Sequence, residues 1–344
     1  MTSPNFSIII PGFNRPEPLK HTLRSAAAAA ERLAGSAEII LVDDGSEPAL
    51  THQLAGFDHA VNVQHVRQPN QGSIVARLTG LRAASGAQVL FLDSDDLIHP
   101  DKLKRHAEVF ASGGADIMYD DMAEARLGPD FSATFTPGPS LATVTDQSAL
   151  FLTVQPAPHG PTYRRTYLTS ALAAPLVPLT RWMDPAGDIW LYYNLLVHPA
   201  RIAKINASLT ATGPHEDVRY SQHWEILGAA SLLIVEEFTA RCPDRPELVA
   251  VRRLVGETAF RSWRRLPRDY HAGYANRLLA VWRAFPQGSA AALGGPLFRA
   301  LAALSGAEAA GQILRCLNHD YASCRTMTDA ELARLFPPPD KPTV

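Results

Sequence analysis

Cysteine is scarce in this sequence: its 344 residues include only Cys242, Cys316 and Cys324, and no CxxC pair. So sparse and odd a set argues against a disulfide framework and fits a reducing compartment. Long apolar runs are also missing, because charges or prolines interrupt every stretch approaching the roughly 18 residues that a membrane span needs. The apolar run ending at Ile10 follows no Lys or Arg and is too short for a signal peptide. We expect a cytoplasmic protein, with peripheral contact at the inner face of the cell membrane left open.

An excess of positive charge is absent as well. The chain has 32 Lys and Arg against 34 Asp and Glu, a formal net charge of −2. Binding to nucleic acid relies on neutralising phosphates, so this balance argues against a nucleic-acid partner. Hydrophobic residues make up 46% of the chain and charged residues 19%, which predicts a folded protein with a buried core.

Two common nucleotide-binding loops are missing too. The first apolar run is followed by Pro11-Gly12-Phe13-Asn14, so the GxGxxG fingerprint of dinucleotide-binding proteins is not present. No GxxxxGK[ST] phosphate loop occurs anywhere in the chain. A nucleotide site in this protein must therefore be built from other groups.

The first 120 residues alternate short apolar runs with stretches of helical periodicity. Strands are expected at 6–10, 38–43, 61–66, 89–93 and 116–119, and helices at 16–33, 73–84 and 100–112. Strands that are apolar throughout and separated by helices predict an α/β fold: a Rossmann-like, mostly parallel sheet with helices on both faces.

Polar clusters stand at the carboxyl ends of three of these strands, where such sheets bind ligands. They are Pro11–Arg15, Asp43–Ser46 and Asp93–Asp96. Carboxylates gathered in the third cluster repel one another unless a cation lies among them. Hard divalent cations such as Mn²⁺ or Mg²⁺ take oxygen ligands and share them with substrate phosphates.

Four motifs occur in order along this half of the chain: PGFNR from Pro11, VDDGS from Val42, NQG with Ala76-Arg77, and FLDSDD from Phe91. Together they resemble family 2 glycosyltransferases with the GT-A fold. The resemblance covers about residues 6–120 and, more weakly, 155–221.

The resemblance implies a binding site for a nucleotide-sugar donor, most readily a UDP-sugar. Donor-binding residues would be Pro11, Phe13, Asn14, Arg15, Asp43, Asp44, Arg77, Asp93 and Asp95. Among them Pro11 and Asp44 would line the base pocket, and Asp95 would approach the ribose. The cofactor would be Mn²⁺ or Mg²⁺, with metal ligands Asp96, Asp95 and His215.

The family also places an aspartate as general base at the start of a helix. Here Gly187-Asp188 resembles that ED motif with Gly in place of Glu, so Asp188 is the expected catalytic base and Asp184 the fallback. One base without a covalent intermediate fits inversion at the sugar centre.

Each residue also has a plainer interpretation. The Asp93–Asp96 run and Asp43–Asp44 are also compatible with simple turns, Asp188 with a helix N-cap, and Arg77 with a solvated helix position. His215 fits a surface or core position equally well, and Trp182 and Trp190 fit the core as well as a sugar-stacking role. Asp120-Asp121 is expected to form a solvated turn.

The whole chain is expected to divide into three parts. Residues 1–221 are expected to form the GT-A domain, with 1–120 as its nucleotide-sugar half and 121–221 as its acceptor half; 127–159 reads as loop. Residues 222–336 are expected to be helical and 337–344 disordered. Arginines interleaved with aromatics between Val251 and Phe285 suggest packed helices, an anionic-lipid surface, or a partner or homodimer surface.

The function predicted from the sequence is metal-dependent, inverting transfer of a sugar to a saccharide or lipid-linked acceptor in polysaccharide biosynthesis. Alternatives are a sugar-phosphate nucleotidyltransferase and a non-catalytic module that binds sugar nucleotides or membrane surfaces.

Overall fold

The structure is a computed structural model that describes residues 5–57, 63–214 and 223–335. The chain divides into two compact units, Met1–Pro175 with His198–Asp217, and Leu176–Val197 with Val218–Val344. We describe each unit by itself. The domain limits expected from the sequence stay a prediction.

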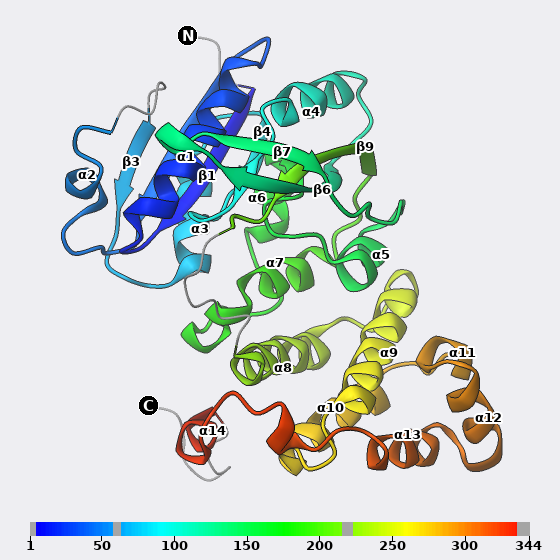
Figure 1. Ribbon diagram of the computed structural model, residues 1–344. Coiled ribbons are helices and arrows are strands. Elements are labelled where there is room, and N and C mark those ends of the chain that lie inside the picture. Colours follow the sequence, from blue (N-terminus) through cyan, green and yellow to red (C-terminus); the bar gives the residue numbers. More distant parts are fainter. Residues whose placement is uncertain (1–4, 58–62, 215–222, 336–344) are drawn as a thin grey trace. The chain divides into compact units, whose positions relative to one another are not determined.

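The first unit is a mixed β-sheet covered by helices (Figure 1). Its strands are β1 (Phe6–Gly12), β2 (Ala37–Asp43), β3 (Val63–Arg67), β4 (Gln88–Phe91), β5 (Leu97–Ile98), β6 (Ile117–Leu127), β7 (Ala133–Pro137), β8 (Thr162–Arg164) and β9 (Ile202–Ala211). Its helices are α1 (Pro16–Glu31), α2 (Leu50–Gln53), α3 (Ser73–Ala83), α4 (Lys102–Ala111), α5 (Gln147–Ala149) and α6 (Arg165–Leu172). The strand order among the described residues is β3-β2-β1-β4-β8-β6-β9-β5, with β7 paired to β6.

The half of the sheet that the sequence predicted is parallel, as expected. β1 pairs in parallel with β2 and β4, and β2 with β3. Every residue of β1 is buried, because the sheet is covered on both faces. Ile8 and Ile10 join a core cluster with α1 and α4, whereas Ile9 faces Gly80 of α3. The expected α/β fold with helices on both faces is thereby confirmed.

The half after α4 differs from the expectation. β8 runs antiparallel to β4, and β6 and β7 form a hairpin where the sequence suggested loop. Asp120 and Asp121 lie inside β6 and are buried, so the predicted solvated turn is wrong. The hairpin was hidden because Pro129 and Pro137 break up the apolar pattern that marks strands.

The second unit is helical, as the sequence predicted for its larger part. Its helices are α7 (Gly187–Leu195), α8 (Trp224–Arg241), α9 (Val249–Arg265), α10 (Ala272–Ala284), α11 (Ala290–Leu293), α12 (Pro296–Ser305), α13 (Ala307–Cys316) and α14 (Asp329–Leu335). In the described part of the chain, no helix combines the length and the apolar character needed to cross a membrane.

Candidate active site

The loops after β1 and β2 are held together by hydrogen bonds. Asn14 has a left-handed backbone (φ 52°), which an Asn side chain tolerates better than most residues. Its N–H donates to Ser46 Oγ (2.9 Å), and its own Oδ1 accepts from the N–H of Glu47 (2.9 Å). Pro11 is buried at the end of β1, and Phe13 stands exposed beyond it. The first two predicted clusters therefore form one surface at the carboxyl edge of the sheet.

The carboxylates of Asp43 and Asp44 organise the surrounding backbone. Asp43 accepts from the N–H groups of Ser46 (2.8 Å) and Leu50 (3.0 Å), so it shapes its own turn. Asp44 reaches further along the sequence and accepts from the N–H groups of Gln71 and Gly72, each at 2.9 Å. Asp44 therefore ties the loop after β2 to the start of α3. Its predicted contact with a nucleobase stays a prediction.

Arg77 projects from α3 onto the DSDD segment. It is 8% exposed, and its Nη2 donates to Asp93 Oδ1 at 2.5 Å. The plain interpretation of Arg77 as a solvated helix residue is therefore wrong. Arg15 Nη1 donates to Asp95 Oδ2 at 3.0 Å. Two guanidinium groups thus pair with two carboxylates of the DSDD segment. Guanidinium groups placed in this way can also bind the oxygens of a diphosphate.

Asp96 is the most enclosed carboxylate of the motif, and its main partner is a histidine that the sequence did not single out. Its Oδ2 lies 2.9 Å from His159 Nδ1, and its Oδ1 accepts from the N–H of Gly213 (3.0 Å). Gly213 fits only because it lacks a side chain, since a Cβ there would lie 1.8 Å from the carbonyl oxygen of Asp95.

The protonation of His159 follows from this pairing. Burial alone lowers the pKa of an imidazole, but the carboxylate of Asp96, reinforced by Asp93, raises the pKa of His159 above its ordinary value. The pair therefore favours imidazolium beside carboxylate. The only sequence signal for this role was the weaker resemblance of the segment around His159-Gly160.

A second buried cluster supports this one. Lys102 Nζ donates to Asp120, to Thr210 Oγ1 (2.7 Å) and to the carbonyl oxygen of Gly160 (2.8 Å). His106 Nε2 lies 2.8 Å from the same oxygen of Asp120. Because Gly160 directly follows His159, this cluster fixes the segment that carries the partner of Asp96.

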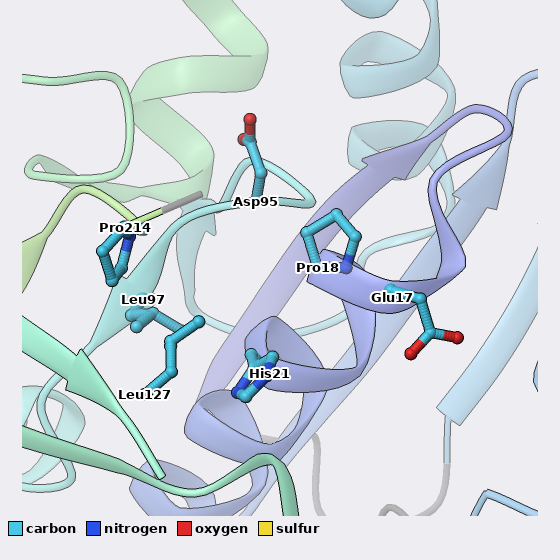
Figure 2. Close-up of a pocket in the computed structure, with 8 residues that line it drawn as sticks. Glu17, Pro18, His21, Asp95, Leu97, Leu127 and Pro214 are labelled. Carbon is cyan, nitrogen blue, oxygen red and sulfur yellow. The ribbon is translucent and has the colours of Figure 1, made fainter. Parts of the chain in front are cut away.

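Asp95 borders a hollow with a volume of about 280 Å³. Figure 2 shows its walls, which come from α1, the DSDD loop, β5, the end of β6 and the segment after β9. The lining residues are Glu17, Pro18, His21, Asp95, Leu97, Leu127, Gly213 and Pro214. The volume lies just below the about 300–1,000 Å³ that is usual for small-molecule pockets.

Carboxylate oxygens are the ligands that Mn²⁺ and Mg²⁺ prefer, so Asp95 and Asp96 fit the predicted cation chemically. Within residues 5–57, 63–214 and 223–335, no group of three His, Cys, Asp or Glu side chains is arranged to hold a metal. A magnesium-type ion often uses only one or two protein carboxylates and takes its other ligands from substrate phosphates and water. Two aspartates therefore fit such an ion, whereas His215 lies outside the described residues.

The predicted base belongs to the second unit. Asp188 is half-buried in the first turn of α7, whose N-cap is Ala186, so Asp188 is not that cap. Asp184 is half-buried in the short 3₁₀ segment that precedes α7. Trp190 is buried and donates to the carbonyl oxygen of Val177 (3.0 Å), which makes it a core residue. The roles of both aspartates stay predictions.

Solved structures with the same architecture define the class of fold. The S. aureus TarS 1-349 complex with UDP-GlcNAc matches with a TM-score of 0.58 at 19% identity, covering 90% of each chain. The mannosyltransferase PcManGT from Pyrobaculum calidifontis, in complex with GDP-Man and Mn²⁺, matches with a TM-score of 0.52 at 14% identity, covering 92% of this chain and 87% of that one. These likenesses establish the GT-A fold predicted from the sequence.

The sequence comparison then points to a family. Residues 7–159, somewhat less than half of the chain, match the family described as "Glycosyl transferase family 2". A curated relative is the "Undecaprenyl-phosphate 4-deoxy-4-formamido-L-arabinose transferase" of Pseudomonas fluorescens, 36% identical over 130 residues. That match covers 37% of this chain and 37% of the relative, so the chain spans little more than a third of that protein.

Proposed function

We propose that this protein is a metal-dependent, inverting glycosyltransferase that moves a sugar from a UDP-sugar to a hydroxyl of a saccharide or lipid-linked acceptor. The observation that carries the proposal is the joining of the polar loops at the carboxyl edge of β1, β2 and β4. Asn14, Asp44 and Arg77 connect these loops through the contacts given above. The match of residues 7–159 to the family 2 glycosyltransferases supports the reaction class.

The donor end of the reaction rests on the first unit. Asp44 and Pro11 would receive the base, and Arg77 and Arg15 would face the diphosphate once their carboxylate partners reorganise around it. Asp95 and Asp96 would hold Mn²⁺ or Mg²⁺, which when bound neutralises the leaving diphosphate and polarises its oxygens. The complexes of TarS with UDP-GlcNAc and of PcManGT with GDP-Man and Mn²⁺ support a nucleotide-sugar donor for this fold.

The acceptor end rests on Asp188. Its carboxylate would take the proton of the acceptor hydroxyl while that oxygen bonds to the anomeric carbon. The bond from the anomeric carbon to the diphosphate oxygen breaks, and the nucleoside diphosphate leaves. A lipid-linked acceptor is supported by the curated relative, whose name includes an undecaprenyl phosphate.

A thermal-shift panel of UDP-, GDP-, dTDP- and CDP-sugars, each with and without Mn²⁺, tests donor binding. Mass action raises the melting temperature only for a ligand that binds the folded state, with about 2.7 kcal/mol of stabilisation at 100 times its Kd. We expect the largest shift with a UDP-sugar plus Mn²⁺. A shift that is equal with and without Mn²⁺ would contradict the metal requirement.

Asp188→Asn and Asp184→Asn form a matched pair that tests the base. General-base catalysis contributes about 10²–10⁴-fold, so Asp188→Asn should lose that much transfer while its donor-induced thermal shift is retained. Asp184→Asn should keep near-normal transfer. The opposite pattern assigns the base to Asp184, and full transfer by both variants overturns both assignments.

A further inference from the structure

The last helices of the second unit present an apolar outer face. α12 and α13 follow one another in the second unit (Figure 1) and pack against each other. Their inner side is anchored by Phe298, which is 1% exposed and whose ring centroid lies 5.8 Å from that of Phe260 in α9. Four large apolar side chains point away from that core: Leu297 (63% exposed), Leu304 (88%), Ile313 (45%) and Leu317 (77%). We call these four residues the α12–α13 face.

Charge is nearly absent from this part of the chain. Between Ala290 and Leu317 the only charged residues are Arg299, Glu308 and Arg315. Glu308 accepts from Arg283 Nε (2.8 Å), and Arg315 is buried over the ring of Trp263 at 5.3 Å. The other exposed positions of the two helices are uncharged: Pro296, Ala300, Ala303, Ser305, Ala309, Gln312 and Cys316. Large exposed apolar side chains on two adjacent helices with so little charge are typical of a docking site.

Cations border the α12–α13 face. A hollow with a volume of about 470 Å³ is lined by Arg264, Arg265, Leu314, Leu317, Asn318 and His319. Leu317 thus belongs both to the face and to the wall of a basic hollow. Within the described part of the chain, Arg264, Arg265 and Arg299 have no ion-pair partner.

Some other arginines of the second unit do have carboxylate partners. Arg268 pairs with Asp320, and Arg277 with Glu236. Arg264 and Arg265 thus supply positive charge beside the exposed Leu317. A ligand for this region must offer both an apolar phase and negative charge.

We propose that the α12–α13 face, together with Arg264, Arg265 and Arg299, docks the protein on a bilayer that contains anionic lipids. Leucines of an amphipathic helix enter the boundary between headgroups and acyl chains, while guanidinium groups bind the phosphates. A second copy of this chain is a poorer occupant. Self-pairing of the face would bring arginines against arginines with no free carboxylate on the face to compensate them.

The proposal is tested by co-sedimentation of the full chain with phosphatidylcholine vesicles, with and without phosphatidylglycerol. Binding should require phosphatidylglycerol and weaken as salt rises. Arg265→Gln with Arg299→Gln should reduce the partition constant about 25-fold, because each arginine near an anionic surface contributes about fivefold, or about 1 kcal/mol. Leu304→Ser with Leu317→Ser should reduce it about tenfold or more.

Matched controls are available in the same unit. Val249 is exposed at the start of α9 and Arg245 in the preceding loop, so Val249→Ser and Arg245→Gln should leave binding unchanged. The helical content of each variant, measured by circular dichroism, separates lost docking from lost folding. The thermal shift induced by the donor should be normal in all of them, so failure of docking is distinguishable from failure of the proposed sugar transfer.

Cys316 gives a second readout, since it is exposed between Ile313 and Leu317. An environment-sensitive fluorophore on Cys316, with Cys242 and Cys324 replaced by serine, should shift to the blue on anionic vesicles. The same label on Arg245→Cys, with all three native cysteines replaced by serine, should not. Equal binding to neutral vesicles, an unchanged label at Cys316, or a dimer that the leucine variant dissociates without any vesicle binding would each overturn the proposal.

Discussion

Asp96 and Asp120 make an instructive pair in the first unit. Each is a buried aspartate beside a buried histidine, with nearly equal distances of 2.9 Å to His159 and 2.8 Å to His106. Their surroundings differ in one respect above all. Asp120 also binds Lys102 and Thr210, and its side chain is fully enclosed. Asp96 lies beside Asp95, which opens on the hollow shown in Figure 2.

The two histidines respond in opposite directions. Burial lowers the pKa of His106, and the neighbouring charge of Lys102 adds to that effect despite the hydrogen bond to Asp120. At His159 burial acts in the same direction, but Asp96 outweighs it and the pKa is raised. A carboxylate already neutralised by lysine therefore leaves its histidine neutral. The protonation of each histidine therefore depends on whether a further charged group, such as Lys102, lies beside the histidine–aspartate pair.

The largest effect on stability is expected from Asp120→Ala. Removing one partner of a buried ion pair leaves the other charge uncompensated and costs about 3–5 kcal/mol. Urea unfolding followed by circular dichroism should show this loss. All five tryptophans, Trp182, Trp190, Trp224, Trp263 and Trp282, lie in the second unit, so their fluorescence reports on that unit separately.

Glu124→Ala is the matched control, since Glu124 is an exposed carboxylate on the same strand β6. It should change the free energy of unfolding by no more than about 0.5 kcal/mol. If Asp120→Ala behaves like Glu124→Ala, the buried cluster contributes nothing to the fold, and the contrast with Asp96 disappears.

Asp96→Ala should lose less stability than Asp120→Ala, and its main effect should be on sugar transfer. Its removal leaves His159 without its carboxylate, which costs about 1–3 kcal/mol of stability. Sugar transfer, measured as release of nucleoside diphosphate with Mn²⁺ present, should fall by about 10²–10³-fold or more, as when a group that stabilises developing charge is lost. Full transfer by Asp96→Ala would remove the metal assignment, whereas Glu124→Ala should transfer normally.

The surroundings of Asp96 and Asp120 also show which features of the site the sequence could predict and which it could not. The parallel strands and the DSDD segment were predictable because their signals are local, namely buried β-branched runs followed directly by polar residues. The partners of Asp120 are not local: Thr210 is 90 residues away along the chain. His159 is likewise distant in sequence from Asp96, so no spacing rule connects them. Asp120 therefore looked like part of an acidic turn, and only the fold shows it enclosed in β6.

The smallest predicted effect is a pH dependence that isolates His106. Its Nδ1 is buried without a hydrogen-bond partner among the described residues, which fits a neutral ring donating from Nε2 to Asp120. The unfolded chain takes up a proton below a pKa of 6.5, but the folded chain resists it because its pKa is lowered. Stability should therefore fall as pH decreases below 6.5, by at most about 1.4 kcal/mol per pH unit.

His106→Gln should lower the free energy of unfolding at neutral pH but reduce this slope between about pH 5 and 6.5. Comparing slopes rather than absolute stabilities cancels the other histidines, since both proteins share them. An unchanged slope would mean that His106 is charged in the folded protein. In that case the electrostatic distinction between the Asp120 and Asp96 pairs would no longer hold.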